Sequence, residues 1–177
     1  MMKEIELKVL EVNAETVKGK LEKLGFKKVF EGMIHSCYFD MNGKLRETGR
    51  VLRLRRRGDT TLLTYKEVTY ERFKKALEIE LEVSSFDEMK AILERLGFKV
   101  YLRVTKHRIS YKGKDGNVVL DTIIEPIKIP TYAEIESSSS RKVDKIIRKL
   151  GLSDMKIVNW NEETVINYYM NTLRKAD

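Results

Sequence analysis

The 177-residue chain contains one cysteine, two prolines, one tryptophan and no glutamine. Its only cysteine, Cys37, cannot form an intramolecular disulfide, and a lone thiol is typical of a reducing compartment, so we expect a cytoplasmic protein. No apolar run approaches the roughly 18 residues of a membrane span, so we expect no membrane partner. The first predicted strand begins almost at Met1, so we expect no signal peptide. The lack of glutamine beside abundant lysine and glutamate is a pattern of thermophilic proteins.

Two familiar kinds of functional site are also missing. The chain has no G-x-x-x-x-G-K-[ST] motif, so a P-loop cannot be its phosphate site. Its two histidines, His35 and His107, are not part of a ligand-spaced cluster, and we expect packing or surface roles for them rather than metal binding. What the chain has in excess is positive charge. Its formal net charge is +8, which fits a polyanionic partner.

The tripeptide Glu-Ile-Glu occurs three times, at residues 4–6, 78–80 and 134–136. Each copy is followed by a helical stretch that ends in Leu-Gly. In a strand, residues i and i+2 point to the same face, so each copy directs two carboxylates one way and an isoleucine the other. A repeated strand–helix unit with acidic residues on one strand face suggests that the carboxylates surround something cationic.

Periodicity and turn signals predict about eight strands, most of them joined by hairpins, and four helices, within a single domain over residues 1–177. The expected strands are Lys3–Val12, Val29–Phe39, Val51–Arg57, Thr61–Lys66, Leu77–Val83, Leu102–Tyr111, Val118–Ile124 and Thr131–Glu136. The expected helices run over about Asn13–Leu24 and Phe86–Leu96, after the serines Ser137–Ser140, and from about Asn161. Residues Val68–Lys75 are expected to form a charged loop.

Most of the predicted strands carry charged residues on one face and apolar residues on the other. Arg53, Arg55 and Arg57, for example, alternate with Leu52 and Leu54. Alternating strands often place their polar face in water, so these rows could be a solvated surface with weak ion pairs. The outer helices, however, need an apolar sheet face, and that face lies opposite the charges. We therefore expect an α+β fold with a closed antiparallel eight-stranded β-barrel, a tunnel with charges inside and helices packed outside.

A tunnel that carries both signs of charge suits a metal-bound polyphosphate. Mg²⁺ and Mn²⁺ prefer carboxylate oxygens and commonly keep waters and substrate phosphates as further ligands. Arginine forks and lysine ammonium groups bind phosphate oxygens and neutralise the charge that develops during phosphoryl transfer.

These residues resemble the CYTH family, which includes class IV adenylyl cyclases and thiamine triphosphatases and is also called the triphosphate tunnel metalloenzyme family. The family signature Glu-x-Glu-x-Lys is present at residues 4–8. The later family elements follow in order as Arg53 with Arg55, Lys66, Glu78 with Glu80, Lys106 with Arg108, Asp121, and Glu134 with Glu136. The match covers nearly the whole chain.

The resemblance implies a role for each group of residues. The metal, Mg²⁺ or Mn²⁺, would be bound by Glu4, Glu6, Asp121, Glu134 and Glu136. The triphosphate would be held by Lys8, Arg53, Arg55, Lys66, Lys106 and Arg108. Glu4, Glu6 and Lys66 are the expected catalytic residues, with Lys66 either positioning or deprotonating water or simply contacting phosphate. Glu78 and Glu80 are expected as further tunnel residues.

The leading hypothesis is a metal-dependent triphosphatase that acts on tripolyphosphate, ATP or thiamine triphosphate, in which activated water attacks the terminal phosphorus. An adenylyl cyclase that makes cyclic AMP and pyrophosphate from ATP is the alternative enzyme. A basic RNA-binding module is the alternative without catalysis, but aromatic residues do not interleave the arginine strand as stacking platforms would. Nucleic acid is therefore disfavoured as a partner, and a homodimer is left open.

Overall fold

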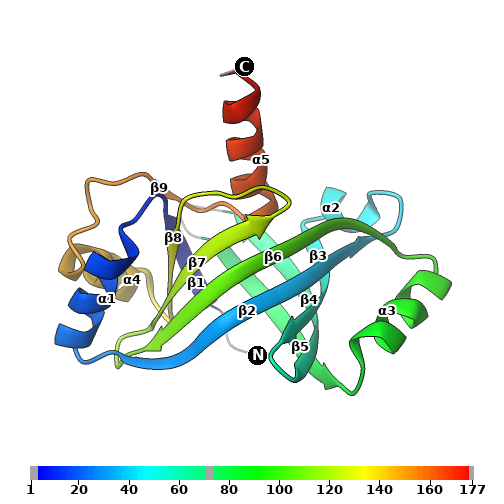
Figure 1. Cartoon of the computed structure of the whole chain (residues 1–177), viewed down its shortest axis with the longest axis horizontal. Coiled ribbons are helices and arrows are strands. Elements are labelled where there is room, and N and C mark those ends of the chain that lie inside the picture. The colour runs from blue at the N-terminus through cyan, green and yellow to red at the C-terminus, as the bar shows by residue number, and fades with distance from the viewer. Residues whose placement is uncertain (1–3, 71–73, 176–177) are drawn as a thin grey trace.

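The computed structural model describes residues 4–70 and 74–175, and of residues 4, 69, 70 and 74–76 it describes the backbone alone. Within this part the fold is α+β, with one large antiparallel sheet and helices around it (Figure 1). The strands are β1 (Glu4–Val9), β2 (Lys27–Asp40), β3 (Arg50–Arg57), β4 (Thr60–Tyr70), β5 (Lys74–Val83), β6 (Lys99–Lys112), β7 (Asn117–Glu125), β8 (Tyr132–Ser137) and β9 (Ile157–Val158). The helices are α1 (Ala14–Lys23), α2 (Lys44–Glu47), α3 (Phe86–Arg95), α4 (Ser140–Lys149) and α5 (Glu162–Arg174).

The strands follow the order β5-β4-β3-β2-β6-β7-β8-β1-β9 in the sheet. Strand β1 also pairs with β5, through Glu4↔Ala76, Ile5↔Lys75 and Glu6↔Lys74. The sheet is therefore curled so far that its first strand meets its fifth, although this contact is short. The expected antiparallel α+β architecture is confirmed, while complete closure of an eight-stranded barrel stays a prediction.

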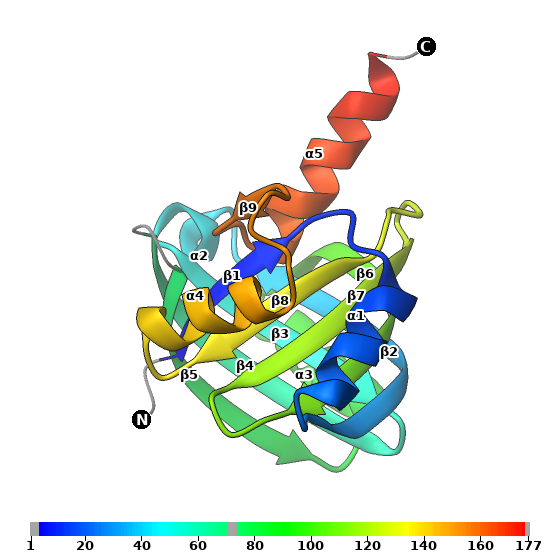
Figure 2. The ribbon, with the colours of Figure 1, turned by 90° about the vertical axis from the view of Figure 1, so that its left-hand side faces the viewer.

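Three of the helices begin at a residue whose side chain caps the first turn. The side chains of Asn13, Ser85 and Asn161 each accept a hydrogen bond from a backbone N–H in the first turn of α1, α3 and α5, respectively. Helix α4 lies across the outside of β1 and β8, and α5 stands on one end of the sheet and projects away from it (Figure 2). Within the described residues, no helix is long and apolar enough to cross a membrane.

Four details of the fold differ from the expectation. The predicted loop Val68–Lys75 is wrong over its described residues, because β4 and β5 extend through it with pairs such as Val68↔Ala76. Helix α2 and strand β9 were not expected, since a one-turn helix and a two-residue strand carry almost no periodic signal. The helices also leave part of the sheet uncovered: Ile79 and Leu81 on the outside of β5 are 50% and 59% exposed.

The two faces of the sheet have different cores. On the outside, α1 and α4 pack against residues such as Val9 and Ile135, and α3 packs against Leu54. On the inside, Val165 and Ile166 of α5 join an apolar cluster at one end. The remainder of the interior is polar, and this arrangement positions the candidate site.

Candidate functional site

A cavity of about 720 Å³ lies among the inward-facing side chains of the sheet, beneath the N-terminal end of α5. Nearly all the residues predicted from the sequence line it, namely Glu6, Lys8, Arg53, Arg55, Lys66, Glu78, Glu80, Lys106, Arg108, Glu134 and Glu136. The prediction that the charged strand faces gather around one internal space is therefore confirmed. The side chain of Glu4 lies outside the described part of the structure, so its role stays a prediction.

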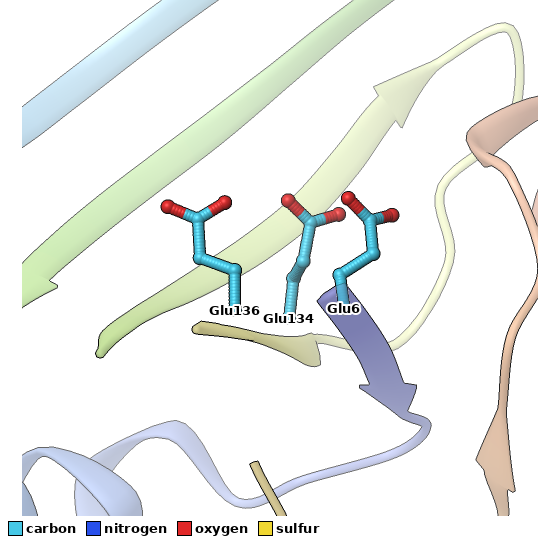
Figure 3. Close-up of side chains that lie close together, drawn as sticks. All are labelled: Glu6, Glu134 and Glu136. Atoms are coloured by element: carbon cyan, nitrogen blue, oxygen red, sulfur yellow. The ribbon is translucent and has the colours of Figure 1, made fainter. Parts of the chain in front are cut away.

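Three carboxylates come together on one wall of the cavity. Each of Glu6, Glu134 and Glu136 offers an oxygen, and these oxygens lie within 4.8 Å of one another (Figure 3). The pairing of β1 with β8 explains this arrangement, because Glu6 lies directly opposite Glu136 and Lys8 opposite Glu134. Same-face residues on adjacent antiparallel strands have neighbouring side chains. The first and third Glu-Ile-Glu copies thus form one acidic group, which we call the carboxylate triad.

The electrostatics of the carboxylate triad favour a bound cation. Burial and the charge of Glu134 raise the pKa of Glu136. The ammonium of Lys8 lies 2.9 Å from Glu6 and 2.5 Å from Glu134. Burial alone would lower the pKa of Lys8, but these two carboxylates raise it overall. Lys8 is joined by Arg108, whose guanidinium lies 4.0 Å from Glu134. The three carboxylates still place several oxygen donors together, and all-oxygen donors suit a hard divalent metal. The residues present therefore fit such a metal.

Two arginines on β3 form a positively charged group in the same cavity. The Nε atoms of Arg53 and Arg55 are buried and have no hydrogen-bond partner among the described residues. The charge of Arg53, with burial, lowers the pKa of Arg55 to about 10. Buried hydrogen-bond donors without partners are uncommon in proteins and costly. Two like charges held side by side with unused donors indicate a binding site for an anion.

Lys106 and Arg108 on β6 are held by a buried aspartate. Asp121 accepts hydrogen bonds from Lys106 Nζ at 2.9 Å and from Arg108 Nε at 2.7 Å. Burial alone would raise the pKa of Asp121, but Arg108 and Lys106 lower it. Asp121 is fully buried and is not part of the carboxylate triad. The structure thus does not bring it to the other predicted metal ligands, and this contact pattern favours a role in orienting Lys106 and Arg108.

The second Glu-Ile-Glu copy, on β5, faces cations. Lys66 Nζ lies 2.5 Å from Glu78, and Arg55 donates a hydrogen bond of 3.2 Å to Glu80. Thr64 also donates to Glu80, at 2.8 Å. Glu78 and Glu80 line the same cavity as the carboxylate triad but each is engaged by a basic residue. They hold Lys66 and Arg55 in the cavity wall.

Several cavity residues were not found from the sequence. Tyr38 belongs to β2 and lies directly opposite Arg53 of β3. Glu162 and Glu163 occupy the first turn of α5. Acidic residues at a helix start are ordinary, because they complement the helix dipole, so these two gave no signal. Tyr38 could have been found only from the register of β2 against β3. Arg46 and Tyr101, stacked with 4.5 Å between guanidinium carbon and ring centroid, complete the mouth of the cavity.

Comparisons with known proteins agree with this arrangement. The Methanocaldococcus jannaschii protein MJ0240, whose name is "Putative adenylate cyclase", is 29% identical over 169 residues, 93% of this chain and 94% of that protein. The structure of the PH1012 protein from Pyrococcus horikoshii OT3 is similar with a TM-score of 0.74 and 28% identity, covering 86% of this chain and 94% of the other. The PH1819 protein of the same organism also has a TM-score of 0.74, with 27% identity, and the match covers 98% of this chain and 99% of that one.

The family of the chain is shown by a match to a protein-family model. A family model described as the CYTH domain matches residues 2–164. This stretch includes every strand and charged residue that lines the cavity. The chain therefore belongs to the CYTH domain family.

Proposed function

We propose that the protein is a divalent-metal-dependent enzyme that acts on triphosphates and hydrolyses the terminal phosphate. Tripolyphosphate, ATP and thiamine triphosphate are the candidate substrates. The proposal includes a single cytoplasmic domain over residues 1–177, with the curled sheet acting as a closed tunnel around the substrate.

One observation carries this proposal. Arg53 and Arg55 present buried Nε donors that lack partners among the described residues, inside a cavity that also holds the carboxylate triad. Guanidinium groups bind phosphate oxygens strongly because charge and paired donors act together. A linear polyphosphate carries several such oxygens and can contact more than one cation at once. The unsatisfied donors therefore support a phosphate chain as the ligand.

Glu6, Glu134 and Glu136 would hold the metal, which we take to be Mg²⁺ or Mn²⁺ because carboxylate oxygens suit both ions. A bound divalent ion in such a site supplies Lewis-acid polarisation of phosphate oxygens and lowers the pKa of coordinated water. Lys8 forms ion pairs with both Glu6 and Glu134 and so would orient these carboxylates.

The basic residues of the cavity would bind and orient the substrate. Arg53 and Arg55 would bind phosphate oxygens, and Arg108, fixed by Asp121, would neutralise negative charge in the transition state. Lys66 is held on Glu78 at 2.5 Å, so its ammonium has a defined place in the wall and contacts phosphate as a cation. A closed tunnel would restrict water near the reacting phosphate, which would strengthen each of these interactions.

Product analysis tests the proposal. Tripolyphosphate and ATP, each incubated with the protein and Mg²⁺ or Mn²⁺, should release orthophosphate, with pyrophosphate or ADP as the second product. Anion-exchange chromatography separates these species from cyclic AMP. If neither compound were converted in the presence of Mg²⁺ or of Mn²⁺, the proposal would be contradicted.

A second candidate is an adenylate cyclase. It is favoured by the name of the Methanocaldococcus jannaschii relative and by the cavity volume of about 720 Å³, which lies within the range for nucleotide-sized ligands. Cyclisation also requires the ribose hydroxyl to be held against the α-phosphorus, whereas hydrolysis requires only water and the charged groups described above. Cyclic AMP with pyrophosphate as the main products would favour the cyclase.

A further inference from the structure

The carboxylate of Glu162 occupies a polar position inside the cavity, at the first turn of α5. It accepts hydrogen bonds from Tyr38 Oη at 2.5 Å and from Tyr132 Oη at 3.3 Å, and it forms an ion pair with Lys106 Nζ. The Glu162 side chain is only 9% exposed, and that of Lys106 is 3% exposed. Three buried donors from β2, β6 and β8 thus contact this carboxylate, and Tyr132 and Lys106 also lie within hydrogen-bond distance of Asp121, at 3.3 and 2.9 Å.

This set of donors suits a phosphate group as well as it suits a carboxylate. It combines one ammonium with two hydroxyl groups, and the guanidinium of Arg53 adjoins Tyr38. Burial alone would raise the pKa of Glu162, but Lys106 and the hydrogen bonds lower it to about 2, so the carboxylate is ionised. The surroundings are therefore built to hold a fully charged oxyanion.

The attachment of α5 does not depend on Glu162 alone. Val165 and Ile166 are buried in the apolar cluster, and Tyr169 donates a hydrogen bond of 2.9 Å to Glu11. Lys106 likewise keeps a second anion, Asp121, at 2.9 Å. A rotation of the Glu162 side chain would thus release the three donors while both the helix and the lysine stay in place.

We propose that the position filled by the Glu162 carboxylate is a phosphate subsite, and that a bound triphosphate displaces Glu162 from Lys106, Tyr38 and Tyr132. The inference rests on the proposed function, because it assigns additional substrate contacts to the same cavity. A triphosphate brings several negative charges into the space that this carboxylate lines, and like charges at close range in a low-dielectric interior repel strongly. Glu162 therefore opposes binding, and the two tyrosines become substrate-binding residues.

Calorimetric titration with tripolyphosphate in EDTA tests this without requiring catalysis. Glu162→Gln keeps the shape of the side chain but removes its charge and one of its two acceptor oxygens, so the Kd of this variant should be at least about tenfold lower than that of the unmodified protein. Glu11→Gln weakens the attachment of α5 but lies outside the cavity lining, and it should change Kd by less than about threefold. Tyr38→Phe in the Glu162→Gln background should raise Kd about tenfold.

The possible outcomes separate this inference from the proposed function. If the unmodified protein binds tripolyphosphate and Glu162→Gln binds it equally well or more weakly, the subsite is contradicted and the proposed function stands. An equal gain for Glu11→Gln would also contradict it, since loosening of α5 would then be the cause. If neither the unmodified protein nor Glu162→Gln binds, both inferences fail. Melting curves without ligand verify that each variant is folded.

Discussion

Identical Glu-Ile-Glu sequences have different surroundings on the two walls of the cavity. On β1 and β8, Glu6 and Glu134 are 10% and 14% exposed and form the carboxylate triad with Glu136. On β5, Glu78 and Glu80 are 23% and 34% exposed, and each is engaged by a basic residue of β4 or β3. The difference lies in how the carboxylates are grouped. The first and third copies lie side by side and share Lys8, so their carboxylates form one group that suits a metal, whereas each carboxylate of the second copy pairs with its own cation.

The largest expected effect comes from removing one charge of the carboxylate triad. Glu134→Gln should lower the rate of triphosphate hydrolysis by on the order of a hundredfold or more, because it removes a proposed metal ligand and a partner of Lys8. The measurement is orthophosphate release at saturating Mg²⁺. A hydrolysis rate within about threefold of that of the unmodified protein would contradict a metal site on this wall of the cavity.

A smaller loss is expected from the arginine pair. Arg55→Ala should weaken tripolyphosphate binding by about tenfold to a hundredfold, the value of a charge-assisted hydrogen bond. Arg57→Ala is the matched control: Arg57 lies on the same strand but contacts the ring of Phe30, with its guanidinium carbon 3.9 Å from the centroid. Equal losses in the two variants, measured by calorimetry, would mean that general positive charge rather than the cavity binds the anion.

The acidic pair on β5 should respond in the opposite direction. Glu80→Gln removes the carboxylate that engages Arg55, so tripolyphosphate should bind about threefold more tightly while the hydrolysis rate changes little. Glu80 is partly exposed, and solvent screening keeps this effect small. If Glu80→Gln abolished hydrolysis as Glu134→Gln is expected to do, the two walls would not differ in function.

The smallest effect concerns stability without metal. The raised pKa of Glu136 means that its ionised form destabilises the fold at pH values above that pKa. Glu136→Gln should therefore slightly raise the free energy of unfolding, and with it the melting temperature, at pH 7 in EDTA. Glu78→Gln should slightly lower the free energy of unfolding, because this substitution removes the ion pair between Glu78 and Lys66. A melting temperature that falls with Glu136→Gln, or one that rises with Glu78→Gln, would contradict the comparison.

The strand faces could be predicted from the sequence because side chains alternate with a period of two. Arg53, Arg55 and Lys66 point into the cavity as that alternation required. Strand neighbours could not be predicted, since register depends on long-range pairing. The sequence therefore grouped Asp121 with the metal ligands, whereas the pairing of β7 with β6 places it opposite Arg108.

The end of the cavity could not be predicted for a different reason. Glu162 follows a helix cap, Asn161, and looks like any acidic residue in a first helical turn. Its contact with Lys106 joins residues 56 positions apart and depends on where α5 stands on the sheet. The packing of Val165 and Ile166 against the interior, a long-range contact, helps to fix that place.

The binding of a phosphate chain at Arg53 and Arg55 is tested most directly by thermal unfolding in EDTA with equal concentrations of tripolyphosphate or orthophosphate. A ligand that binds only the folded state raises the melting temperature by mass action. We predict that tripolyphosphate raises it by several degrees and that orthophosphate raises it far less, because one phosphate cannot contact all the cations of the cavity. An equal shift with both anions, or no shift with tripolyphosphate, would contradict a triphosphate site in this cavity.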